Sequence, residues 1–428
     1  MVKRKPYRIT RVNKFDWESV VEDVEDQSVV IGVDVAKEKM VAVVMDEGEA
    51  ILKTVGWSHP TQTLEFIAFL EALRGGGAAS VLVAMEPSGV YGDALRWQLL
   101  LAGFEVSRVS PKKSSDSAEI YDGVRSSHDA KSAAIVAWLH FHGKSEPWPV
   151  KSDHERALKA ALWVLEVHAK QFRQNRNRLE AMTARYWPEL TLQLDLDSAT
   201  LLELLMEFGG PAEVAARSTD ARALMRRVGG SMLKAEKIAA VLRSASATTG
   251  MPQIDEEIRL VKAIATEARR NQHEERSARR QVEKLAGSEG STRHMQPVIG
   301  KTTAAVVVAA AGDPLNYESP QALVKSLGLN LREKSSGKKQ SALHITKRGS
   351  GTARMFLYMA ALRLIKDDPV VKAWYAKKVA RDGGKAKIKA VVAVTRKLVL
   401  ALWHVARGDD FDAAKLFDTR RLSIPSAP

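Results

Sequence analysis

SVVIGVDVA, at residues 28–36, decides the N-terminal fold, because it is a β-branched run interrupted by a single carboxylate, Asp34. Two similar runs follow, KMVAVVM at residues 39–45 and ILKTVG at residues 51–56, with Glu47 and Gly48 in the turn between them. β-Branched residues favour strands, and short polar turns join antiparallel neighbours. The three runs therefore predict an antiparallel meander.

Helical and strand patterns alternate after this meander. The apolar spacing predicts helices over residues 61–74, 93–101 and 130–141, and strands over residues 80–85 and 104–109. A meander followed by alternating helices and strands, with a closing helix, is the order of an RNase H-like α/β domain. We expect this fold over residues 28–150. A basic arm, residues 1–27, precedes it, and its first 15 residues are expected to be disordered or ordered only on a partner.

The remainder of the chain has helical patterns. Long helical patterns at residues 153–187 and 254–285 flank a compact helical stretch with glycine boundaries, which predicts an antiparallel coiled-coil arm with a small helical insert over residues 151–288. Such an arm either dimerises or spaces two domains. A mostly helical, basic domain is expected over residues 289–421, followed by a tail at residues 422–428. Tryptophans 97, 138, 163, 374 and 403 lie on apolar helical faces and are expected in the core.

Composition excludes several classes of protein. The chain has 428 residues, 45% hydrophobic and 27% charged, which is ordinary globular usage. No apolar run approaches the roughly 18 residues of a membrane span, and no signal peptide is evident, so a soluble, cytoplasmic protein is expected. Because the sequence contains no Cys, disulfides, thiolate zinc sites and cysteine nucleophiles are excluded. Carboxylates or histidines must hold any metal, and His128, His294 and His344 lack metal-ligand spacing.

The positive charge is concentrated near the C-terminus. The chain has 65 basic and 51 acidic residues, a formal charge of +14, and about 25 of the basic but only about 11 of the acidic residues lie from residue 289 onward. The cations gather in loop clusters rather than along one face of a long amphipathic helix, which favours nucleic acid over a membrane surface. The alternative is a basic surface that only aids solubility.

Three carboxylates are candidates for metal binding. Asp34 interrupts an apolar strand, Glu86 follows the next parallel strand, and Asp129 opens the helix after the fifth strand. The carboxyl ends of strands in an open α/β sheet converge on one crevice, where such a trio can bind Mg²⁺ for phosphoryl chemistry. The alternatives are a local turn contact for Asp34, a solvated strand end for Glu86 and a helix cap for Asp129.

Four segments carry a family resemblance: IGVDVAK, MEPSGVYG, RVSPKK with HDAKSAAIVAWL, and SLGLNLREKSSGKKQSALHITKRGSGTAR. They resemble the DEDD-type insertion-sequence transposases, relatives of the pilin-gene DNA invertase Piv, at both ends of the chain. The resemblance implies an N-terminal domain like the Holliday-junction resolvase RuvC, with four acids that bind Mg²⁺. Asp34, Glu86 and Asp129 match the first three acids. Ser132 stands where the family has the fourth, which implies a weaker metal site or lost activity.

A serine lies within the basic domain. Ser335 and Ser336 precede Gly337 in the stretch 332–348, and a hydroxyl attacks phosphorus only when cations neutralise the developing charge. Composition alone favours a solvated loop. The family resemblance assigns the nucleophile to Ser335, with Ser336 as a close second, and Lys338 replaces a family glycine. The cations expected to bind nucleic acid here are Arg332, Lys334, Lys338, Lys339, Lys347 and Arg348.

Residues 297–312 place a glycine turn before an apolar helix. This resembles a helix-hairpin-helix element, in which Gly300 and Lys301 would bind phosphate through backbone N–H groups and charge. Val298 stands where the family has a second glycine. An ordinary loop before a core helix is equally compatible with the pattern.

Three functions are consistent with these features. The favoured one is a transposase or site-specific recombinase that cuts and rejoins double-stranded DNA through a phosphoserine, with Mg²⁺ assisting. For that function the resemblance implies a homo-oligomer, dimer or tetramer, and a structured non-coding guide RNA. The alternatives are a catalytically weakened nucleic-acid-binding relative and a RuvC-like structure-specific nuclease that uses water.

Overall fold

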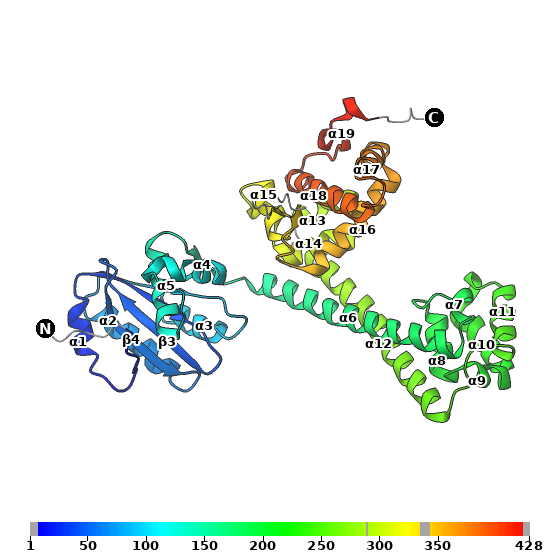
Figure 1. Cartoon of the computed structure of the whole chain (residues 1–428), viewed down its shortest axis with the longest axis horizontal. Coiled ribbons are helices and arrows are strands. Elements are labelled where there is room, and N and C mark those ends of the chain that lie inside the picture. The colour runs from blue at the N-terminus through cyan, green and yellow to red at the C-terminus, as the bar shows by residue number, and fades with distance from the viewer. Residues whose placement is uncertain (1–6, 288–289, 334–342, 423–428) are drawn as a thin grey trace. The chain divides into compact units, whose positions relative to one another are not determined.

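The computed structural model describes residues 7–287, 290–333 and 343–422, and the chain folds as two compact units, residues 1–150 and 151–428 (Figure 1). Lys334, Ser335, Ser336, Lys338 and Lys339 lie outside the described residues. None of the described helices is long and apolar enough to cross a membrane.

The first unit is built on a mixed sheet of strand order β1-β4-β3-β2-β5-β6-β7. The strands are β1 (Thr10–Arg11), β2 (Ser28–Asp34), β3 (Lys39–Met45), β4 (Ile51–Ser58), β5 (Ser80–Met85), β6 (Val106–Arg108) and β7 (Glu146–Pro147). β2, β3 and β4 are mutually antiparallel neighbours, whereas β5 joins β2 in parallel and β6 joins β5 in parallel. The predicted meander and the RNase H-like arrangement of mixed sheet and helices are therefore present.

Helices cover both faces of this sheet. They are α1 (Glu18–Asp23), α2 (Thr63–Gly75), α3 (Asp93–Leu101), α4 (Pro111–Asp122) and α5 (Asp129–Phe141). Successive side chains of a strand point to opposite faces, so Val29, Ile31 and Val33 of β2 join the core of α1, α2 and α3, whereas Val30 faces α5.

Gly32 lies where α5 approaches β2 most closely. A Cβ atom there would stand 2.2 Å from the carbonyl oxygen of Ala133 and 2.5 Å from the amide nitrogen of Ala137. Only glycine fits this contact, which fixes α5, and with it the start of that helix at Asp129, against the sheet.

Three expectations for the first unit are wrong. Residues 7–27 are not a loose arm: β1 pairs with β4, and Val12, Val20 and Val24 are buried in the core. The polar stretch before α5 contains the helix α4, which the sequence pattern did not predict. Trp97 is 48% exposed rather than in the core, as is Trp163 of the second unit at 66%.

The second unit begins with two long helices that flank a small helical insert. α6 (Asp153–Tyr186) and α12 (Asp255–Ala286) run antiparallel: Nδ1 of His168 lies 3.0 Å from Oδ1 of Asn271, and the Tyr186 hydroxyl donates to Glu257 at 2.6 Å. The insert has its own core, in which Trp187, Leu201 and Phe208 are buried. Its elements are α7 (Leu190–Gln193), α8 (Ala199–Phe208), α9 (Pro211–Ala216), α10 (Ser218–Gly229), η1 (Gly230–Met232) and α11 (Ala235–Ser246).

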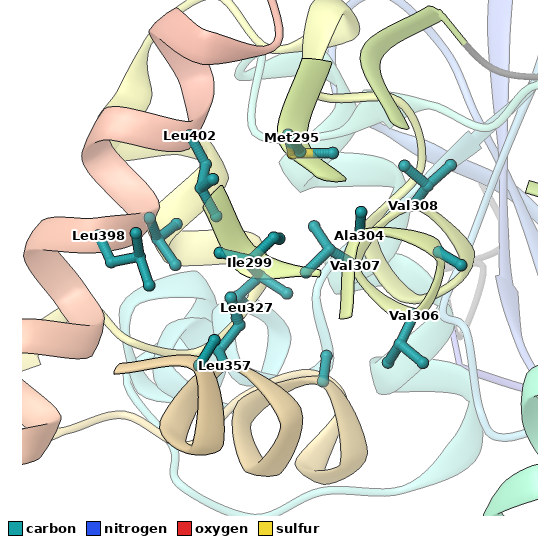
Figure 2. Packing of buried hydrophobic residues seen from close by; sticks show 14 of the residues in the cluster. Met295, Ile299, Ala304, Val306, Val307, Val308, Leu327, Leu357, Leu398 and Leu402 are labelled. Atoms are coloured by element: carbon teal, nitrogen blue, oxygen red, sulfur yellow. The ribbon is translucent and has the colours of Figure 1, made fainter. Parts of the chain in front are cut away.

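The C-terminal helices form a bundle that also buries the first turns of α6 and the end of α12. Figure 2 shows its core, where Ile299 packs among side chains of four other helices and a loop. Its elements are α13 (Gly290–Ile299), α14 (Lys301–Ala311), η2 (Pro314–Asn316), α15 (Pro320–Ser326), β8 (Leu331–Arg332), β9 (His344–Ile345), α16 (Gly351–Asp367), α17 (Pro369–Arg381), α18 (Lys387–Val405), α19 (Ala413–Leu416) and η3 (Thr419–Arg421).

Candidate active site

Asp34 and Glu86 lie at the carboxyl ends of two adjacent parallel strands. Asp34 is the last residue of β2, and Glu86 follows Met85, the last residue of β5, which pairs with Val33. Val30 and Ala84, in step with the two acids along their strands, both face α5. The alternation of side chains therefore directs both carboxylates to the side of the sheet that α5 covers.

Asp129 is brought to the same place by α5. Its predecessor His128 caps this helix, with Nδ1 accepting the backbone N–H of Lys131 at 3.2 Å. Lys131 is 1% exposed, and its ammonium donates to Oδ1 of Asp122 at 2.7 Å and to the carbonyl oxygen of Val124. The end of α4 and the start of α5 are thereby joined around the third acid.

The three carboxylates interact electrostatically. Burial raises the pKa of Asp34 to about 6, and the negative charges of Glu86 and Asp129 contribute to this rise. Burial also raises the pKa of Glu86, whereas a hydrogen bond from the Ser114 hydroxyl lowers it. Like charges in a half-buried place disfavour ionisation unless a cation compensates them. The arrangement therefore favours a bound cation.

Ser114 is a site residue that sequence reasoning missed, because α4 itself was missed. A signal for this helix was present: Pro111 stands at its first position, and Gly123, with φ of 76°, ends it in a left-handed conformation. Proline at the first turn and glycine just after the last are standard helix boundaries. Ser114 is 6% exposed and stabilises the ionised form of Glu86.

The donor set matches a divalent cation in kind but is not closed around one. Carboxylate and hydroxyl oxygens suit Mg²⁺. Within residues 7–287, 290–333 and 343–422, however, no three His, Asp or Glu side chains are grouped closely enough to hold a metal ion. Ser132 at the fourth position is half-buried, and its Oγ lies 3.2 Å from Oγ of Ser127. The three acids thus share one electrostatic environment without forming a preassembled site.

The two ends of the serine loop are held by a frame that we define as residues 328–333 and 343–350. β8 pairs with β9. The amide of Thr346 donates to the Asn330 carbonyl at 2.9 Å, and its hydroxyl donates to Oδ1 of Asn330. The amide of Lys347 donates to the Gly328 carbonyl at 2.9 Å. Arg332, Lys347 and Arg348 are all exposed on this frame.

Close contacts and strain also mark the frame. Lys347 adopts φ of 57°, a left-handed conformation that costs a non-glycine residue about 1 kcal/mol or more. Gly328 is required beneath it, because a Cβ there would lie 1.9 Å from the Arg348 carbonyl oxygen. Arg354 donates to the carbonyls of Leu327 and Gly349, at 3.1 Å each. The frame is therefore rigid, and it presents cations on both sides of the serine positions.

Gly300 forms the predicted turn between two helices, α13 and α14, with φ of 81°. Arg363 lies beside it, since a Cβ on Gly300 would be 3.3 Å from one guanidinium nitrogen. Lys301, however, lies 3.8 Å from Oε2 of Glu283, whose other oxygen accepts the Thr302 hydroxyl. This acid partly offsets the positive charge of the turn.

Comparison with known proteins agrees with these features. A family model described as Transposase, of the DEDD type, matches residues 31–188, and a second, described as Transposase IS116/IS110/IS902 family, matches residues 294–376. Together they cover more than half of the chain. An uncharacterized 43.6 kDa protein of insertion element IS110 from Streptomyces coelicolor is 25% identical over 120 residues, which are 28% of this chain and 29% of that protein. The chain thus spans less than a third of this relative.

The first family model begins in β2 and contains Asp34, Glu86 and Asp129, and the second contains Gly300, the frame and the serine positions. The two matches come from the same kind of protein, follow the same order as the domains and leave the helical insert between them. The chain therefore belongs to the DEDD-type insertion-sequence transposases of the IS116/IS110/IS902 family.

Proposed function

We propose that this protein is a DNA transposase that cuts and rejoins double-stranded DNA through a serine nucleophile, with Asp34, Glu86 and Asp129 as the Mg²⁺ ligands. The observation that carries the proposal is the electrostatic interaction of these three acids at the carboxyl ends of β2 and β5. The family match to both halves of the chain supports DNA as the substrate.

The nucleophile is Ser335, with Ser336 as the alternative. Its Oγ attacks phosphorus, the bond between phosphorus and the leaving oxygen of the strand breaks, and the serine proton passes to solvent or to that oxygen. A phosphoserine results, and a hydroxyl of the partner strand displaces the serine to rejoin DNA. Arg332, Lys347 and Arg348 of the frame offset the negative charge that develops on phosphorus.

The acidic site holds the substrate's phosphate region through a cation. A divalent cation bound by Asp34, Glu86 and Asp129 would supply charge neutralisation at the scissile phosphate. Ser114 keeps Glu86 ionised, and Ser132 offers a neutral hydroxyl in place of the fourth acid. We further propose a homo-oligomer that pairs two DNA sites, a structured guide RNA, and the division into arm, RuvC-like domain, coiled-coil arm and serine domain given by the sequence.

Two single substitutions test the nucleophile. Ser335→Ala and Ser336→Ala, compared on the same end-labelled DNA, should both leave DNA binding intact, while one of them abolishes the covalent protein–DNA adduct. The remaining serine variant is the matched control. Adducts that persist in both variants would refute the serine assignment.

Ser132 favours a second candidate, a nucleic-acid-binding relative whose acidic site no longer binds metal. Removal of one carboxylate lowers the charge available to a cation, and the described acids form no preassembled group of three. Titration calorimetry with Mg²⁺ separates the two functions. The transposase predicts measurable binding that Asp34→Asn removes, whereas the inactive relative predicts identical, negligible heats for both proteins.

A further inference from the structure

A second cluster of cations surrounds the loop between α17 and α18, far in sequence from the serine frame (Figure 1). Between residues 377 and 389 the chain carries six basic side chains and one acidic side chain, Asp382. We define the α17–α18 patch as its four exposed cations, Arg381, Lys385, Lys387 and Lys389.

Asp382 does not neutralise this patch. Its Oδ2 accepts the ammonium of Lys378 at 2.6 Å, and the two side chains are only 18% and 13% exposed. The hydrogen bond from Lys378 lowers the pKa of Asp382, and the charges of Lys389 and Arg381 lower it further. Arg381 is 3.8 Å away through Nε and remains 72% exposed. The single carboxylate is thus turned inward against Lys378, and the outer surface stays positive.

The position of the lysines is unfavourable for the chain alone. Lys387 and Lys389 lie in the first turn of α18, a helix of 19 residues with no acidic residue in that turn and no side-chain cap. Cations at a helix N-terminus are destabilising by about 0.3–1 kcal/mol each, because the helix dipole is positive there. A polyanion lying across the patch reverses the sign of this interaction.

The neighbouring side chains indicate which polyanion fits. Single-stranded nucleic acids are bound through exposed aromatic rings, but Trp374 and Tyr375 of α17 are half-buried against the bundle core. A membrane surface requires an apolar face beside the cations, and Ile388 is the one large apolar side chain exposed between residues 377 and 389. Flexible cations without stacking partners suit the phosphate backbone of a duplex.

We propose that the α17–α18 patch binds the phosphate backbone of double-stranded DNA without sequence preference. This inference rests on the proposed function for the identity of the nucleic acid, but it concerns a surface outside the serine frame and outside the acidic site. The patch contributes affinity and salt dependence, and leaves the chemistry to the residues described above.

The test is a salt titration of the full chain on a labelled random-sequence 40-base-pair duplex. Removal of one lysine–phosphate ion pair lowers the slope of log affinity against log salt by about 0.9. Lys387→Gln with Lys389→Gln should therefore reduce the slope by about 1.8 and weaken binding most at low salt. Lys234→Gln with Lys237→Gln is the matched control, because these exposed lysines lie at the start of α11 in the helical insert. The control should bind as the wild type does.

Loss of fold cannot mimic this result, since removal of first-turn lysines should leave the melting temperature unchanged or raise it. A slope equal to the wild-type value overturns the proposal, as does displacement of the DNA by a 40-base-pair RNA duplex at lower concentration than by unlabelled DNA. All titrations are repeated in the Ser335→Ala background. A reduced slope there supports the patch even if adduct experiments reject the serine, whereas the absence of any salt-dependent DNA binding by the parent chain rejects both.

Discussion

The hydroxyl of Ser350 donates a hydrogen bond to Oε1 of Glu166 at 3.0 Å, across 184 positions of sequence. Ser350 also caps α16, because its Oγ accepts the backbone N–H of Ala353 at 3.2 Å. Glu166 belongs to α6, and Ser350 is the last residue of the serine frame. The long helix of the arm thereby contacts the frame that carries the proposed nucleophile.

Glu166→Ala should loosen the first turn of α16. A hydrogen bond to a carboxylate is worth about 1 kcal/mol or somewhat more, which corresponds to amide exchange about fivefold faster at residues 351–355. Hydrogen exchange followed by mass spectrometry measures this directly. Glu166→Gln keeps an acceptor oxygen at the same place and should show less than half of the effect. Equal exchange in the alanine variant and the wild type would show that the contact contributes nothing to the frame.

Gly32→Ala should destabilise the first unit by about 1–3 kcal/mol or more, because its Cβ would overlap the backbone of α5 at Ala133 and Ala137. The helix must shift, and Asp129 moves with it. Thermal unfolding should show the loss of stability, and Mg²⁺ titration should show weaker binding.

Gly75→Ala is the control for this substitution. Gly75 ends α2, and no atom lies within 4 Å of the point where its Cβ would stand, so alanine should be neutral or slightly stabilising. If both variants melt at the same temperature, close packing of α5 on β2 does not limit stability.

The sequence predicted the elements that carry the acids, for a physical reason. β3, β5 and α3 have the predicted bounds, because strands buried on both faces are continuous apolar runs and Gly103 ends its helix clearly. α4 was missed because most of its residues are polar, and Ser114 was missed with it. The interaction of Asp34 with Glu86 and Asp129 depends on half-burial, which no local pattern reveals. The packing of residues 7–27 depends on pairing with β4, which lies over 40 residues away.

Lys131→Met should release the loop between α4 and α5. The buried ammonium of Lys131 holds Oδ1 of Asp122 and the carbonyl of Val124, and methionine fills the same volume without donating either hydrogen bond. Trypsin should then cleave after the exposed Arg125 several-fold faster. Lys112→Met, which removes an exposed ion pair to Asp116, should leave this cleavage unchanged. Unaltered cleavage in the Lys131 variant would mean that other contacts order the loop.

Glu189 makes the helical insert sensitive to acid. Burial alone would raise the pKa of this carboxyl, but hydrogen bonds from the Thr249 amide and from the hydroxyls of Thr248 and Thr249 outweigh burial and lower the pKa to about 2. A carboxyl whose pKa is lower in the folded state than in the unfolded state stabilises the fold above the unfolded value, about 4.3, and loses that contribution as the pH falls toward 2. Glu189→Gln should therefore accelerate exchange of the Thr249 amide at pH 7. The difference from the wild type should shrink between pH 4.5 and about 2, where the wild-type carboxyl is also neutral. A difference that stays constant across this range would show that the ionised carboxylate is not what holds Thr248 and Thr249.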